Sequence, residues 1–158
     1  MKNKRMIKIY QLTGILLIID QIIKIIINNC MELYQEIVVI PKFFSILFVK
    51  NTGAAFSIFE DGVVYLSILS VIFIVIINRY IKKEIDNFNK YDIIAYGMIL
   101  GGIFGNLIDR IIHHGVIDYL SFSFGKYSFA VFNFADICIV CGVLLLIVNM
   151  LFLNKKKG

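Results

Sequence analysis

The sequence contains few charged residues for its length. Asp, Glu, Lys and Arg make up 17% of its 158 residues, against about 25% in a soluble domain. Its hydrophobic fraction is 59%, where roughly 45–50% is ordinary. A water-soluble domain of this size would have too little polar surface to cover so large an apolar interior. The composition therefore excludes an ordinary soluble domain and predicts a membrane protein, built as a single domain of residues 1–158.

The sequence also lacks the residues for a disulfide framework or a metal centre. Its three cysteines cannot all pair. Cys138 and Cys141 form a C-x-x-C inside an apolar segment, where we expect thiols to act as small packing groups rather than as a redox pair. No H-E-x-x-H or comparable cluster is present, and the adjacent His113 and His114 are poorly spaced to bind one ion. We therefore expect no metal and no cofactor.

Long apolar segments are abundant. A membrane core of about 30 Å is crossed by roughly 20 helical residues. Four segments approach or reach that length, at about residues 9–27, 62–81, 93–112 and 132–153. We expect the first to be a retained helix and not a cleavable signal peptide, because it contains Asp20 and Lys24 and no small-residue cleavage site follows it. We predict four transmembrane helices.

The distribution of positive charge predicts the orientation of these helices. Three patches hold most of the lysine and arginine, at residues 2–8, 79–90 and 155–157. Each patch flanks an apolar segment, which is typical of cytoplasmic loops near anionic lipid and not of a nucleic-acid groove. Both termini and the loop 82–92 are therefore expected in the cytoplasm. Residues 28–61 and 113–131 are expected outside.

Proline occurs once, at Pro41, between two segments rich in β-branched and aromatic residues. These segments, 37–40 and 43–49, are predicted to be short strands. The alternative is an ordinary loop, but we favour a sheet that roofs a site at membrane level. Phenylalanines would hold this sheet against the membrane surface, namely Phe43, Phe44, Phe48, Phe56 and Phe59. The predicted fold class is a mainly α membrane protein with four transmembrane helices and a small extracytoplasmic β-sheet between helices 1 and 2.

Polar residues within the apolar segments are costly and therefore candidates for function. Asp20 and Lys24 lie on one face of the first helix, so they could neutralise each other or contact a substrate. Asn106 and Arg110 lie on one face of the third helix, toward its outer end, with Asp109 beside them. A guanidinium at this level can hold an acceptor group or orient a carboxylate.

Two aspartates are predicted at the same membrane level. The third helix runs outward into the segment that carries Asp118, and the fourth runs inward from Asn133 and Asp136. Two close carboxylates tend to share one proton, so one can activate water while the other polarises a carbonyl. Peptide hydrolysis, proton or ion conduction and a non-catalytic scaffold all remain open on these grounds. A Ser57–Lys50 dyad is weaker, because nothing marks either residue as activated.

Five motifs in order resemble those of one family, the bacterial lipoprotein signal peptidases, or type II signal peptidases, which are membrane aspartyl proteases. Asp20-Gln21 with Lys24 resembles the family's first-helix motif, and residues 51–57 resemble its N-x-G-A-A-F block. Residues 101–110 resemble its G-G-x-x-G-N-L-I-D-R block. Residues 116–119 and 132–136 resemble the two blocks that carry its catalytic aspartates.

The resemblance implies an aspartic endopeptidase with Asp118 and Asp136 as its catalytic dyad. It implies that other residues bind or position the substrate and the dyad: Asn51, Gly102, Asn106, Arg110, Asn133, Asp20 and Lys24. The substrates would be prolipoproteins, cut before a diacylglyceryl-modified cysteine, and the inhibitor would be globomycin. The enzyme would use no metal and would be a monomer in the bacterial cytoplasmic (inner) membrane, with its active site on the outer face.

Overall fold

The described part of the chain forms four long helices and a small sheet. A computed structural model describes residues 2–53, 62–125 and 127–153. Its elements are α1 (Lys2–Cys30), β1 (Glu36–Ile40), β2 (Phe44–Asn51), α2 (Val63–Glu84), α3 (Lys90–His113), β3 (Val116–Phe124), β4 (Tyr127–Ser128), α4 (Phe134–Val148) and a π-helical turn, η2 (Asn149–Leu153). Four helical spans, the last including η2, are long and apolar enough to cross a membrane. The predicted fold class is confirmed.

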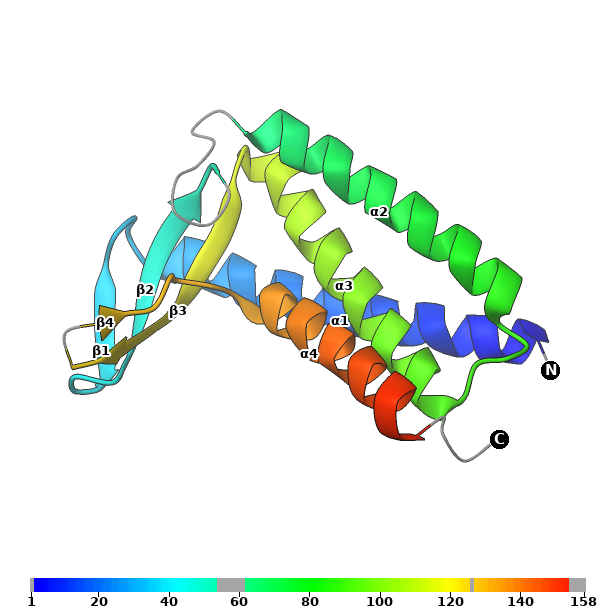
Figure 1. Ribbon diagram of the computed structural model, residues 1–158. Helices are drawn as coiled ribbons and strands as arrows, with labels where there is room; N and C mark the ends of the chain where they lie inside the picture. Colours follow the sequence, from blue (N-terminus) through cyan, green and yellow to red (C-terminus); the bar gives the residue numbers. More distant parts are fainter. Residues whose placement is uncertain (1, 54–61, 126, 154–158) are drawn as a thin grey trace.

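Helix α3 is the centre of the bundle. It packs against α1, α2 and α4, and the sheet lies at the end of the helices opposite both termini (Figure 1). Half of the most apolar stretch of α3 is buried inside the protein, against 6% of that of α2. Helix α3 therefore carries most of the internal contacts, while α2 leaves its apolar side chains free to face lipid.

Glycines allow α3 to approach its neighbours closely. Gly101 and Gly105 form a G-x-x-x-G, a pattern that allows another helix to approach closely, and Gly101 faces the backbone of Thr13 in α1. A Cβ atom at Gly102 would collide with the carbonyl oxygen of Ala135 and lie 2.7 Å from Ile139 Cγ1 in α4. The separation of α3 and α4 thus depends on the absence of a side chain at Gly102.

Replacing Gly102 with Ala is expected to destabilise the protein by about 1–3 kcal/mol, because the added methyl group would push α4 away from α3. Thermal unfolding in detergent would measure the loss. Gly14→Ala in α1 is the matched control, since nothing lies within 4 Å of a Cβ atom there. Equal melting temperatures for the two variants would contradict the close approach.

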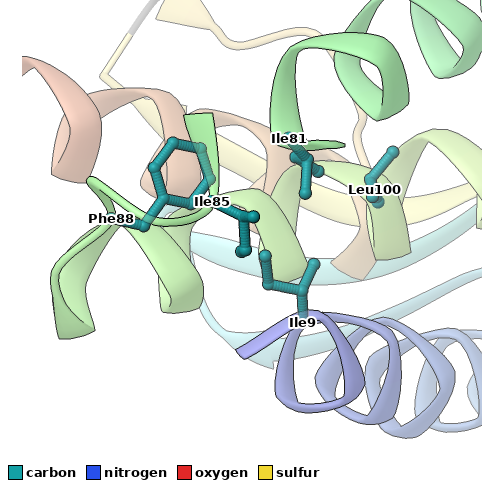
Figure 2. Packing of buried hydrophobic residues seen from close by; sticks show 5 residues of the cluster. All are labelled: Ile9, Ile81, Ile85, Phe88 and Leu100. Carbon is teal, nitrogen blue, oxygen red and sulfur yellow. The ribbon is translucent and has the colours of Figure 1, made fainter. Parts of the chain in front are cut away.

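A cluster of apolar side chains closes the bundle near the termini. Figure 2 shows Ile9 of α1 facing Ile85, with Ile81, Phe88 and Leu100 completing the cluster. Arg5 donates from Nη1 to the carbonyl oxygens of Ile85 and Asp86, at 3.1 and 2.7 Å. These contacts hold the beginning of α1 against the end of α2. Helix α1 runs from Lys2 to Cys30, so it extends beyond the predicted interval 9–27 at both ends.

The sheet is antiparallel in the order β1-β2-β3-β4. Strands β1 and β2 agree with the predicted strands on either side of Pro41. Strands β3 and β4 come from the connection between α3 and α4 and were not predicted. The missed signal was the alternation of apolar and polar residues over 120–124.

The inner part of the sheet packs against α1. Phe48, Ile117 and Tyr119 form a buried cluster with Ile27. Phe48 therefore faces the interior, which corrects the expectation that it faces the membrane surface. The expected membrane contacts of Phe56 and Phe59 lie outside the described residues. The cluster fixes β3 relative to α1, and with it the strand that carries Asp118.

Candidate active site

A groove of about 1050 Å³ lies where the sheet meets the helices. Five of the predicted site residues line it: Asn51, Asn106, Arg110, Asp118 and Asp136. They come from the end of β2, the sheet end of α3, the beginning of β3 and the first turn of α4. The fold thus brings together residues that are far apart in the sequence.

Asp118 is almost fully buried, with 3% of its surface exposed. Its Oδ1 accepts a hydrogen bond from Asn133 Nδ2 at 2.6 Å, and its Oδ2 accepts one from Asn51 Nδ2 at 3.1 Å. Burial, followed by the charge of Asp136, raises the pKa of Asp118 from 3.8 to about 7, although the two amide donors oppose this shift. Asp118 can therefore hold a proton near neutral pH.

Asp136 lies in the first turn of α4, where the helix dipole favours a negative charge. Its Oδ2 accepts the backbone N–H of Asn133 at 3.2 Å, and the side chain of Asn133 accepts the backbone N–H of Asp136 at 3.0 Å. This reciprocal capping box fixes the carboxylate relative to the helix. Its Oδ1 accepts a hydrogen bond from Asn106 Nδ2 at 2.7 Å.

Asn133 connects the two carboxylates. Its side-chain amide donates to Asp118, while its backbone N–H donates to Asp136. The second proton of the amide group is donated to Asn106 Oδ1 at 3.1 Å. Asn133 is completely buried, so its geometry is set by the protein and not by solvent. Asp118 and Asp136 are therefore held on either side of one rigid residue.

An ion cluster lies buried beneath the groove, between α1 and α3. The ammonium group of Lys24 contacts Asp20 Oδ2 at 2.9 Å and Asp109 Oδ2 at 2.8 Å, and it donates to Asn106 Oδ1 at 3.0 Å. Its three protons therefore have three acceptors. The predicted Asp20–Lys24 ion pair is present. The ion pair between Lys24 and Asp109 was not predicted, because the sequence does not show which face of α1 packs against α3.

Asp20 and Lys24 do not reach the groove but support the residues that do. Asp20 Oδ1 accepts the backbone N–H of Ala135 at 3.1 Å, at the start of α4. A Cβ atom at Gly105 would collide with the Asp20 carboxylate, which explains the glycine there. Gly102 also lies away from the groove, in the contact between α3 and α4.

The remaining candidates are dispersed. All three cysteines are described and free; Cys138 is buried, as expected of a packing group, but Cys141 is exposed and lines the groove. Lys50 lines the groove, while Ser57 lies outside the described residues. Within residues 2–53, 62–125 and 127–153, no group of three or more His, Cys, Asp or Glu side chains is placed to hold a metal ion. Among the described residues that line the groove, Asp118 and Asp136 are the acidic ones.

Comparisons with known proteins show which family this chain resembles. A lipoprotein signal peptidase of Fusobacterium nucleatum is 43% identical over 143 residues, covering 90% of this chain and 86% of the relative. A lipoprotein signal peptidase of Symbiobacterium thermophilum is 35% identical, and the match covers 88% of this chain and 91% of that relative. A solved structure described as a bacterial membrane enzyme superposes with a TM-score of 0.83 at 28% identity, covering 95% of this chain and 91% of that chain.

A second solved bacterial membrane enzyme gives a TM-score of 0.79 at 29% identity, covering 91% of this chain and 92% of that chain. The family model described as signal peptidase (SPase) II matches residues 12–152. This match spans α1 to α4 and includes every residue of the groove named above. The chain is a multi-pass membrane protein and belongs to the signal peptidase II family.

Proposed function

We propose that this protein removes signal peptides from prolipoproteins by cutting the bond before a diacylglyceryl-modified cysteine, with Asp118 and Asp136 as an aspartic dyad. One observation carries the proposal: Asn133 binds both carboxylates, and both line one groove. Two carboxylates held in this way support hydrolysis without a covalent intermediate.

Asp118 carries the shared proton and Asp136 acts as the base. Asp136 removes a proton from water as the water oxygen attacks the scissile carbonyl carbon. Asp118 donates its proton to the carbonyl oxygen, which becomes a hydroxyl of the tetrahedral intermediate. The C–N bond then breaks, the nitrogen takes the proton from Asp136, and the hydroxyl returns its proton to Asp118. The buried position of Asp118 and the helix-terminal position of Asp136 support these roles.

The other residues bind the dyad or the substrate. Asn51, Asn106 and Asn133 hold the two carboxylates through the hydrogen bonds described above. Arg110 lines the groove, and its charge acts on both aspartates, so its guanidinium is placed to receive a substrate carbonyl. Gly102 permits the close approach of α4, and Asp20 with Lys24 fixes Asn106 and the start of α4.

The groove suits a substrate that is anchored in lipid. Ile137, Val140 and Cys141 of α4 line it below Asp136, and all three lie on a helix able to cross the membrane. Acyl chains of a modified cysteine would lie along this face while the peptide reaches the aspartates. With the basic patches in the cytoplasm, both termini are cytoplasmic and the active site opens at the outer face of the bacterial inner membrane, in a monomer.

The purified protein is expected to cut a diacylglyceryl-modified prolipoprotein and to leave the unmodified precursor intact, because only the lipid places the scissile bond beside the dyad. Gel analysis of both substrates, with and without globomycin, measures this directly. A parallel proteoliposome flux assay tests proton or ion conduction. Equal cleavage of both precursors, or flux without cleavage, would contradict the proposed function.

Cleavage is expected to slow as the pH rises through about 7. The pKa of Asp118 is about 7, so above this pH the carboxyl group has lost the proton that it must donate. Above that value the logarithm of the rate should fall by about one for each pH unit. Initial rates measured on one modified substrate across the neutral range provide the profile. A rate that stays constant or increases through this range would show that Asp118 is not the acid.

A further inference from the structure

The start of α4 is bound by side chains from three parts of the protein. The backbone N–H of Phe134 donates to Tyr119 Oη at 3.2 Å, that of Ala135 to Asp20 Oδ1 at 3.1 Å, and that of Asp136 to Asn133 Oδ1 at 3.0 Å. The first N–H groups of a helix have no partner within the helix. Here each of these three groups has an acceptor, and Asp136 lies in the turn that they hold.

Tyr119 stands beside Asp118 on β3, with its side chain on the other side of the strand. Successive side chains of a strand point to opposite faces. Asp118 therefore lines the groove, while the ring of Tyr119, 5% exposed, packs with Ile27 and Phe48. Tyr119 can act on the geometry of the dyad without touching a substrate in the groove.

Backbone hydrogen bonds tie the same two segments together. The N–H groups of Tyr119 and Leu120 both donate to the carbonyl oxygen of Phe132, at 3.1 and 2.8 Å, and Phe132 donates back to Leu120 at 3.1 Å. The tyrosine hydroxyl extends this pairing by two residues, from Phe132 to Phe134. This hydrogen bond joins β3 to the chain two residues before Asp136.

We infer that Tyr119 is a positioning residue: its hydroxyl fixes the start of α4 against β3 and so sets the separation of Asp118 and Asp136. The inference rests on the proposed function of the two aspartates. Asp20, Asp118 and Asp136 are the charged groups that act on this hydroxyl, and burial, the largest effect, raises the pKa of Tyr119. The hydroxyl therefore stays neutral and remains an acceptor for the Phe134 N–H.

The Tyr119→Phe variant removes the hydroxyl and keeps the ring that fills the cluster. We expect kcat to fall about tenfold with KM changed less than about twofold, because a small misplacement of reacting groups costs rate more than binding. The alkaline limb of the pH profile should also move, since the repulsion between the carboxylates depends on their separation. Tyr10→Phe is the matched control, because the Tyr10 hydroxyl donates to Asn78 Oδ1 at 2.7 Å, between α1 and α2.

Hydrogen exchange supplies a measurement that needs no substrate. In Tyr119→Phe the amide of Phe134 should exchange at least about tenfold faster than in the wild type, while Tyr10→Phe leaves it unchanged. If the wild type cut no lipidated precursor, the proposed function would fail, and exchange would still decide whether the hydroxyl holds α4. Unchanged exchange, wild-type kcat, or equal kcat losses in the two variants with an unshifted pH profile would each overturn the inference.

Discussion

Asp118→Asn and Asp136→Asn are each expected to lower cleavage of a lipidated precursor by about 10³-fold or more, because general acid–base catalysis needs both carboxylates. Asparagine has nearly the same shape as aspartate but can neither take a proton from water nor donate one to a carbonyl oxygen. Cleavage of a diacylglyceryl-modified precursor by the purified variants measures the effect. Asp86→Asn, at an exposed aspartate distant from the groove, is the matched control.

The stability of Asp118→Asn separates a catalytic role from a structural one. A carboxyl group whose pKa rises from 3.8 to about 7 on folding binds a proton more readily in the folded state. The wild type therefore loses stability as the pH rises between these values, and the full penalty applies above about 7. Asparagine carries no such penalty, so the advantage of the variant in thermal unfolding should be greater above pH 7 than in acid. A stability difference between variant and wild type that stays the same from acid to above pH 7 would contradict the raised pKa of Asp118, and with it the role of Asp118 as the acid of the dyad.

The helices were predictable because their signal is local. Each long apolar run predicts a helix from its own composition, and G-x-x-x-G at Gly101 and Gly105 predicts a close neighbour. The identity of that neighbour was not predictable, because the packing of the whole bundle decides whether a given glycine of α3 lies against α1 or against α4. Gly102, one residue from Gly101, points to α4 instead. Adjacent glycines on one helix thus serve two different contacts.

The sequence predicted which residues line the groove better than it predicted how they contact one another. Chain direction placed Asp118 and Asp136 at one level, and the structure brings both to the groove. That Asn133 bridges them was not predictable, because it depends on the bend between β3 and α4. The role of Tyr119 was missed for the same reason: its hydroxyl meets the Phe134 N–H only after β3 has paired with residue 132.

Lys24→Met is expected to destabilise the protein by about 3–5 kcal/mol, because it leaves two buried carboxylates without their cation. Asp20, Lys24 and Asp109 are each exposed by 1% or less, so water cannot replace the lost ammonium group. Thermal unfolding in detergent measures the loss. Lys8→Met is the matched control, since Lys8 is an exposed lysine on the same helix. Equal losses in the two variants would show that the cluster contributes nothing beyond an ordinary surface charge.

Cleavage should be lost in Lys24→Met even where the protein remains folded. Lys24 and the amide of Asn133 both donate to Asn106 Oδ1, which forces the amide nitrogen of Asn106 toward Asp136. In the variant only the amide of Asn133 still donates to Asn106 Oδ1, so the side chain of Asn106 is held less firmly toward Asp136. The triple variant Asp20→Asn/Lys24→Met/Asp109→Asn separates the two effects, because it removes the unpaired charges but does not restore the donor to Asn106. It should recover part of the stability and little of the activity; recovery of both would show that Lys24 acts only through its charge.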